Sequence, residues 1–222
     1  MADKTIRVWD PLVRLFHWSL VLAFIIAWLS GEEESLLHVY AGYVILGLVL
    51  FRLVWGFIGT RYARFSNFLY SPGQTVAYLR SMAGGRPDHY TGHTPAGGWM
   101  IVILLVSLLV TSYTGLEVYG AEGQGPLANG VPAIELVATA RADDDDDDEY
   151  EGEHEGEENP EEELWEELHE LSANLTLLLI FVHVAGVVVA SRLHGENLVK
   201  AMLSGRKTLP GTDDAPVRAQ GG

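Results

Sequence analysis

The chain has 222 residues, with 14 Lys plus Arg, 30 Asp plus Glu and no cysteine, and its formal net charge is -16. Residues 143–170 contain 18 of the 30 acidic residues and no Lys or Arg, so the rest of the chain has a charge close to +2. The absence of cysteine excludes disulfides, Cys-ligated iron–sulfur clusters and covalently attached c-type haem. The few basic residues argue against nucleic acid as a partner.

Four apolar segments predict membrane helices. Uncharged stretches cover Leu15–Gly31, Leu36–Phe51, Thr94–Leu116 and Leu171–Ser191. A membrane helix needs about 20 mainly apolar residues to cross about 30 Å of hydrocarbon. The last two stretches are long enough alone, and the first two become so if Arg14 and Arg52 extend their long side chains to the membrane surface. We therefore expect an all-α integral membrane protein, a four-helix up-and-down bundle with helices at about 12–31, 36–59, 94–118 and 164–192.

The basic residues predict the orientation of this bundle. If the N-terminus is cytoplasmic, 13 of the 14 Lys and Arg residues lie on the inner side, and Arg141 alone lies outside. Positively charged residues concentrate on the cytoplasmic side of membrane proteins. Both termini are therefore expected in the cytoplasm.

The connecting segments differ strongly in composition. The inner loop is expected to carry a short amphipathic helix at Pro72–Met82. Residues 120–163 are expected to form an outer acidic loop, partly disordered because its carboxylates repel one another, and residues 206–222 a flexible tail. The whole chain, 1–222, is read as a single membrane domain.

Four histidines lie in or at the ends of the apolar helices, where ionisable side chains are costly and usually functional. His17 is near the inner end of the first helix, and His38 is near the outer end of the second. His169 begins the apolar part of the fourth helix, and His183 follows 14 residues later. At about 1.5 Å and 100° per residue, His169 and His183 are about 21 Å apart on nearly one helix face. Matching by depth pairs His17 with His183 and His38 with His169.

Two facing histidine pairs in a helix bundle suit two b-type haems, because each haem takes two axial nitrogens and fills apolar space between helices. Zinc or di-iron centres would need more ligands gathered together, usually with carboxylates, and no acidic residue lies inside the four uncharged stretches. A chain of proton-carrying histidines is a rival interpretation, as are four unrelated histidines at the membrane interface. Gly42 and Gly186, close after His38 and His183, would let a flat macrocycle approach the backbone.

The motifs around these histidines resemble a known family. Arg14-Leu-Phe-His17-Trp18, Leu37-His38-Val-Tyr-Ala-Gly42 and Leu168-His169-Glu-Leu-Ser-Ala-Asn174, with Phe-Val-His183 after it, are similar to the prokaryotic cytochrome b561 family, which overlaps the b-type cytochrome subunits of nickel–iron hydrogenases. The resemblance covers residues 5 to about 205 outside the acidic insert. It implies a di-haem cytochrome b of the bacterial inner (cytoplasmic) membrane, with His17, His38, His169 and His183 as the axial iron ligands.

Two further residues are candidate cofactor-binding groups. Arg52 lies within the apolar end of the second helix, where it could pair with a haem propionate or simply extend to the membrane surface. His93 immediately precedes the third helix and could bond a propionate or relay a proton from a quinol.

The expected function is electron transfer between the quinone pool and a periplasmic redox partner such as a c-type cytochrome. The direction of flow, and with it a quinol:cytochrome oxidoreductase activity, is left open by the sequence. One alternative is the membrane anchor of a hydrogenase-like oxidoreductase complex. Another, of a different class, is a transporter or structural membrane protein without haem. The acidic insert is either a solvated spacer or a surface that attracts a basic partner.

Overall fold

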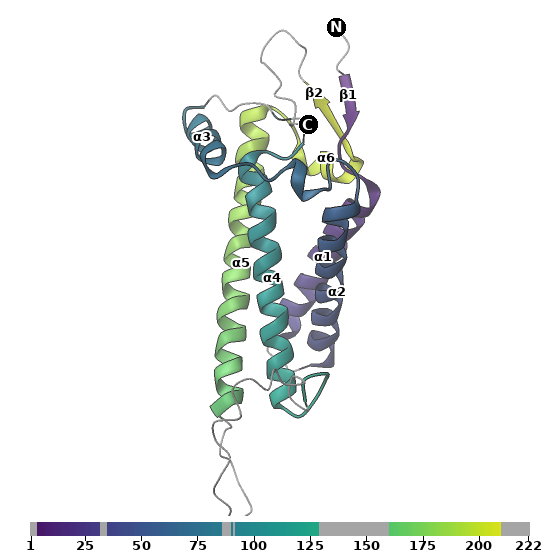
Figure 1. The fold of residues 1–222 in the computed structure, drawn as a ribbon, viewed down its shortest axis with the longest axis vertical. Helices are drawn as coiled ribbons and strands as arrows, with labels where there is room; N and C mark the ends of the chain where they lie inside the picture. The colour runs from purple at the N-terminus through teal and green to yellow at the C-terminus, as the bar shows by residue number, and fades with distance from the viewer. Residues whose placement is uncertain (1–3, 32–34, 86–89, 91, 129–159, 210–222) are drawn as a thin grey trace, which may run out of the picture. The chain divides into compact units, whose positions relative to one another are not determined.

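A computed structural model describes residues 4–31, 35–85, 90, 92–128 and 160–209. Its long helices are α1 (Pro11–Ser30), α2 (Leu36–Ile58), α4 (Pro95–Ala121) and α5 (Pro160–His194). The shorter elements are β1 (Lys4–Arg7), the 3-10 helix η2 (Phe65–Asn67), α3 (Pro72–Ala83), α6 (Leu198–Ser204) and β2 (Arg206–Leu209), most of which are labelled in Figure 1.

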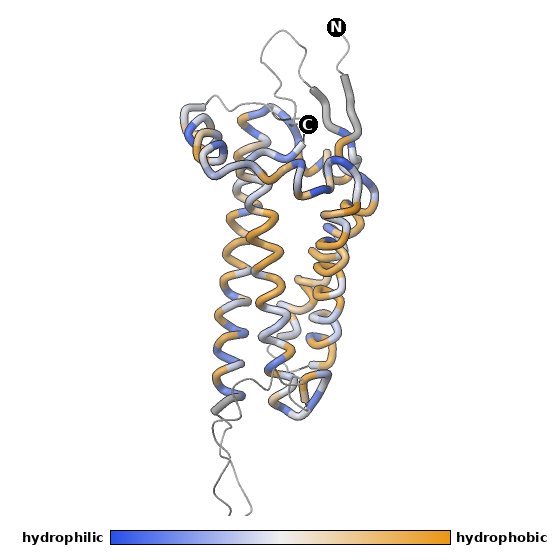
Figure 2. The backbone as a smooth tube through the Cα atoms, viewed as in Figure 1, coloured by the Kyte–Doolittle hydropathy of each residue, from blue (hydrophilic) through white to orange (hydrophobic). Residues whose placement is uncertain are grey.

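All four long helices are long and apolar enough to cross a membrane. Apolar residues dominate much of their length in Figure 2. Large apolar side chains remain exposed along them, for example Leu22 at 61% and Leu29 at 76% on α1. Exposure of this kind would be unfavourable in water and is expected where a helix faces lipid. The prediction of an all-α membrane bundle is confirmed.

The ends of two helices differ from the prediction. α4 continues to Ala121, and α5 already begins at Pro160, so six residues assigned to the acidic loop, 120–121 and 160–163, are helical. Proline is favoured in the first turn of a helix, and glutamates there interact favourably with the helix dipole. These local effects outweigh the repulsion that favoured a loop. Residues 129–159 of the acidic loop lie outside the described residues.

The predicted flexible tail is also shorter. Its first four residues form β2, which pairs antiparallel with β1, with Lys4 opposite Leu209 and Arg7 opposite Arg206. Gly205, with φ 77°, makes the turn that leads into β2, and its carbonyl accepts hydrogen bonds from the main chain of Val8 and Trp9. The two ends of the described chain therefore lie together, and residues 210–222 lie outside the description.

The chain has two compact units, residues 1–109 with 175–222 and residues 110–174, so the single domain expected from the sequence remains a prediction. The core of the first unit is formed by buried residues of three helices: Phe16, Ala23 and Ala27 of α1, Ala41, Ile45 and Val49 of α2, and Leu105 and Leu108 of α4. Residues four apart share a helix face, and the small alanines let α1 and α2 approach closely. A hydrogen bond between Ser107 and the fully buried Thr176 ties α4 to α5 in this unit.

The inner loop forms the expected amphipathic helix, α3. Ser71 and Gln74 form a capping box at its N-terminus, and Pro72 occupies its first turn. Tyr78 is fully buried, and its hydroxyl lies 3.2 Å from Nε2 of His194 at the end of α5. Val76 and Leu79 are exposed. The helix is therefore held to the bundle through Tyr78.

Candidate functional site

His17 and His183 come from α1 and α5 within the first unit. Both rings are half-buried and close enough to interact electrostatically. Nδ1 of His17 is buried without a hydrogen-bond partner, and the ring packs edge-on against Trp18 with centroids 5.1 Å apart. A buried polar group without a partner costs about 1–3 kcal/mol. A buried imidazole with an unsatisfied nitrogen, within electrostatic range of a second imidazole, fits the donor set that a haem iron requires.

His38 has a defined ring orientation. It lies in the first turn of α2, and its Nδ1 donates to the carbonyl oxygen of Ala27 at 2.8 Å. That carbonyl belongs to the last turn of α1, where carbonyls lack the main-chain partners of a helix interior and accept from side chains, and it also accepts from the Ser30 hydroxyl. A neutral imidazole protonated at Nδ1 carries its lone pair on Nε2. The His38 ring is thus in the tautomer that ligates a metal through Nε2.

His169 shows the same feature in the second unit. Its Nδ1 lies 3.1 Å from the carbonyl oxygen of Thr111 and 3.1 Å from Oγ1 of Thr114, both on α4. The buried Thr114 hydroxyl also lies 3.2 Å from Oγ of Ser172. A ring that donates Nδ1–H to the Thr111 carbonyl again presents Nε2 as its metal-binding nitrogen. Such outer hydrogen bonds orient metal-ligating histidines in proteins.

The Arg52 side chain is almost completely buried, with 3% exposed, and does not extend to the surface. Its Nη2 donates to the carbonyl oxygen of Ala63 at 3.1 Å, whereas its Nη1 has no hydrogen-bond partner. The guanidinium carbon lies 5.0 Å from the ring centre of Phe65 and 5.8 Å from that of Phe68. A buried cation with a spare donor is suited to an anionic group such as a propionate.

His93 belongs to the same cluster. Its ring centroid lies 4.4 Å from that of Trp9 and 4.6 Å from that of Phe68. The main-chain carbonyl of His93 accepts a hydrogen bond from Tyr70. Trp9, His93 and Phe68 therefore form a continuous row of rings that ends beneath Arg52.

The first unit brings together four of the six candidates, as the pair His17 and His183 and the cluster of Arg52 and His93. His38 lies in the same unit at the other end of α2, and His169 belongs to the second unit. The pairing of His38 with His169 therefore stays a prediction. A Cβ placed on Gly42 or Gly186 would meet nothing within 4 Å, so the space beside both residues is open, as expected for a haem-binding bundle.

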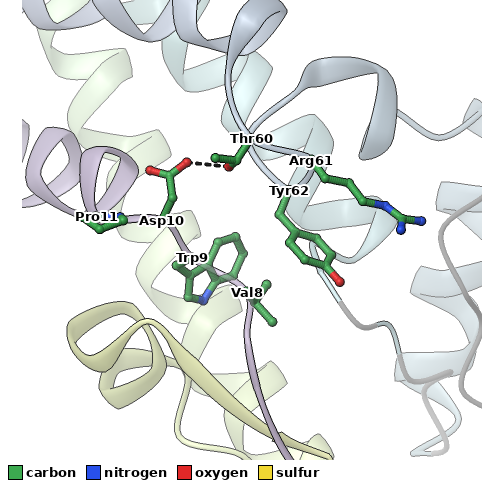
Figure 3. Close-up of a pocket in the computed structure, with 7 residues that line it drawn as sticks. All are labelled: Val8, Trp9, Asp10, Pro11, Thr60, Arg61 and Tyr62. Atoms are coloured by element: carbon green, nitrogen blue, oxygen red, sulfur yellow. Dashed lines mark hydrogen bonds between the residues drawn. The ribbon is translucent and has the colours of Figure 1, made fainter.

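A cavity of about 510 Å³ lies where α1 begins and α2 ends. Its lining comes from two chain segments, residues 8–11 and residues 60–62, and is mainly apolar (Figure 3). Asp10 joins the segments: one carboxylate oxygen caps α1 at the Val13 N–H, and the other accepts from the Thr60 hydroxyl at 2.6 Å. Burial raises the pKa of Asp10, but hydrogen bonds led by that of Thr60 outweigh this effect and hold the pKa below its ordinary value.

Sequence reasoning missed Trp9, Asp10 and Thr114. Asp10 before Pro11 is a common sign of a helix start, and nothing in that pattern indicates a contact with residue 60. Thr114 is a plain polar residue within an apolar span; only the spacing of polar residues along that span could have drawn attention to it. Their roles arise from contacts between segments that are distant in the sequence.

Comparison with known proteins gives one family. A family model described as prokaryotic cytochrome b561 matches residues 8–205. No curated protein and no solved structure matches the chain.

Proposed function

The chain belongs to the prokaryotic cytochrome b561 family and is a membrane b-type cytochrome of electron transfer, and on this premise we propose that it holds two haems and passes electrons between the quinone pool and a periplasmic redox partner. The observation that carries the proposal is the orientation of the histidine rings. His38 and His169 each donate Nδ1–H to a helix carbonyl, which supports Nε2 as the nitrogen that binds iron.

The inner haem would be held by His17 and His183. These rings lie in one unit and are close enough to interact electrostatically, and the unsatisfied Nδ1 of His17 supports a ligand there. The outer haem would be held by His38 and His169. Apolar helices around both sites exclude water, which lets the protein set the potential of the bound iron.

Arg52 and His93 would serve the inner haem. The spare Nη1 of Arg52 supports a hydrogen bond to a propionate, and the Phe65 and Phe68 rings hold the guanidinium in place. His93 contacts the Phe68 ring, which also contacts Arg52. From there His93 could bond the same propionate or exchange a proton with a quinol. Bound haem supplies one-electron transfer, and the side chains supply ligation, charge compensation and orientation.

The proposed location is the bacterial inner (cytoplasmic) membrane, with several passes and both termini in the cytoplasm. The distribution of Lys and Arg supports this orientation. The pairing of β1 with β2 also supports it, because it brings residues 4–7 and 206–209 to one side.

Haem content tests the proposal. The purified chain should show a b-type reduced-minus-oxidised spectrum and two haems per chain by pyridine haemochrome assay. His17→Ala, His183→Ala and the double variant should each retain one haem, since both residues hold the same one. His38→Ala should also retain one, but its combination with His17→Ala should retain none.

His194→Ala is the matched control, because His194 ends the same helix as His183 and contacts Tyr78. It should keep both haems. If His17→Ala and His38→Ala together still retain one haem, the assignment of two separate pairs is wrong.

A further inference from the structure

The cavity beside Trp9 has the shape and lining of a small-molecule site. Ligand cavities typically measure about 300–1,000 Å³ and are mainly apolar with a few polar groups. This one falls within that range and opens at the end of the bundle where α1 starts.

The aromatic side chains of the lining favour a flat ring. The side chains of Trp9 and Tyr62 extend toward the cavity from the two segments that form it (Figure 3). Aromatic rings bind one another by stacking or by edge contact. Asp10 positions both walls, because its carboxylate is bonded to the start of α1 and to Thr60 at once.

The polar groups suit a ring that carries oxygen atoms. The Thr60 hydroxyl donates its hydrogen to Asp10, so its oxygen is left as an acceptor for a ligand hydroxyl. The Asp10 carboxylate, also part of the lining, already accepts hydrogen bonds from Val13, Thr60 and Trp55, so it fixes the direction of the Thr60 hydroxyl.

The position of the cavity connects it with the electron-transfer site. The Trp9 indole that lines the cavity also contacts the His93 ring, and Phe68 continues this row to Arg52. His17 follows Asp10 by seven residues on α1, which corresponds to about 10 Å along the helix axis. A ligand in the cavity would contact Trp9, and Trp9 contacts His93, which belongs to the cluster assigned to the inner haem.

We propose that this cavity, the Trp9–Tyr62 cavity, binds the ring of a quinone or quinol. Trp9 and Tyr62 form its walls, and Oγ1 of Thr60 accepts a hydrogen bond from a ring hydroxyl of the quinol form. The proposal rests on the proposed function, because only a chain that exchanges electrons with the quinone pool requires such a site beside a haem.

The test measures quinone binding and haem content on the same full-length protein in detergent. Titration calorimetry with decyl-tailed ubiquinone and with a short-tailed menaquinone gives Kd, and stopped-flow reduction by the matching quinols gives KM. Trp9→Ala and Tyr62→Ala each remove one aromatic wall of the cavity. Each variant should raise the Kd and the KM about three- to tenfold. The dithionite-reduced haem spectrum should not change.

Two further variants separate a role in the site from a role in folding. Tyr62→Phe keeps the ring and should bind like the wild type. Trp28→Ala removes a half-exposed aromatic residue from the last turn of the same helix as the cavity and should also have no effect. Tyr62→Ala leaves the Trp9–His93 contact intact, so it tests the cavity even if Trp9→Ala does not fold.

The outcomes distinguish the two proposals. If the wild type holds two haems and binds quinone, but Tyr62→Ala and Trp9→Ala bind it equally well, the cavity assignment is overturned and the proposed function stands. If the haem-loaded wild type binds neither quinone, the cavity assignment and the quinone reaction both fail. If the chain contains no haem, the proposed function itself is wrong.

Discussion

The histidines proposed to bind haem in this cytochrome differ in the hydrogen bonds that orient their rings. His38 and His169 lie on different helices and in different units, yet each bonds through Nδ1 to a carbonyl of another helix. His17, by contrast, has a buried Nδ1 without a partner. Because outer hydrogen bonds orient a ligand and raise its basicity, the two sites should differ in affinity and potential.

Replacement of Thr114 tests this difference. Thr114→Val removes the hydroxyl beside Nδ1 of His169 but keeps the Thr111 carbonyl, so the outer haem should remain bound more weakly. Loss of such a partner costs about 10- to 100-fold in affinity, and we expect the lower end. Haem transfer to apomyoglobin should be about tenfold faster for one of the two haems.

Thr111→Val is the control, because Thr111 contacts His169 through its main-chain carbonyl, which valine keeps. Its haem transfer should match the wild type. Equal acceleration in both variants would mean that packing, and not the Thr114 hydroxyl, holds His169.

Asp10 should make stability depend on pH. Its pKa in the folded protein is lowered, so its contribution is fully present above the ordinary carboxyl pKa and is lost as the pH falls through the folded value. Asp10→Asn keeps an N-cap of similar strength but removes the charge. The difference in Tm between wild type and variant should shrink as the pH falls from 6 to 3. A constant difference over that range would show that the Asp10 charge contributes nothing.

At the scale of elements, the close approach of α4 and α5 positions His169. A Cβ on Gly115 of α4 would lie 2.9 Å from Cε1 and 3.2 Å from Nδ1 of the His169 ring. Glycine is therefore required here for space, whereas on α2 and α5 the space beside Gly42 and Gly186 is open. The 14-residue spacing on α5 places His169 and His183 on nearly one face. Helix geometry places the two histidines on one face, and the small Gly115 leaves room for the His169 ring.

Gly115→Ala should displace the His169 ring and remove the outer haem, while the inner haem remains. We expect about half of the wild-type haem content by pyridine haemochrome assay. Gly73→Ala in α3 is the matched control, because a Cβ there meets nothing within 4 Å. It should keep both haems and gain stability, by up to about 1 kcal/mol from helix propensity. Full haem content in Gly115→Ala would contradict the positioning role of this glycine.

For the whole molecule, charge and sidedness are linked. The acidic residues concentrate in 143–170, and 13 of the 14 basic residues fall on the side predicted to be cytoplasmic. The antiparallel pairing of β1 with β2 joins residues 4–7 to residues 206–209 in the first unit. A concentrated negative charge outside the membrane would attract a basic partner and accelerate encounter at low salt.

Deletion of residues 143–158 tests this role. Reduction of a basic c-type cytochrome should slow at least tenfold at low ionic strength, and its salt dependence should flatten, because steering raises association rates by about 10- to 1,000-fold. Replacement of the same residues by a neutral Gly/Ser linker of equal length controls for loop length and should behave like the deletion. An unchanged rate at low salt would contradict a steering role.

The sequence was sufficient for features that depend on one segment at a time. Each span follows from its own apolar length, and the common face of His169 and His183 follows from helix geometry, so the four helices were predicted to within a few residues at most ends. The contacts that tie Asp10 to Thr60, Trp9 to His93, Arg52 to Phe65 and His38 to Ala27 could not be predicted. They join residues 11 to 84 positions apart, and no local pattern specifies which distant groups meet. The tertiary structure alone fixes the ring orientations, the buried guanidinium and the aromatic cavity, because these depend on how helices pack rather than on where they begin and end.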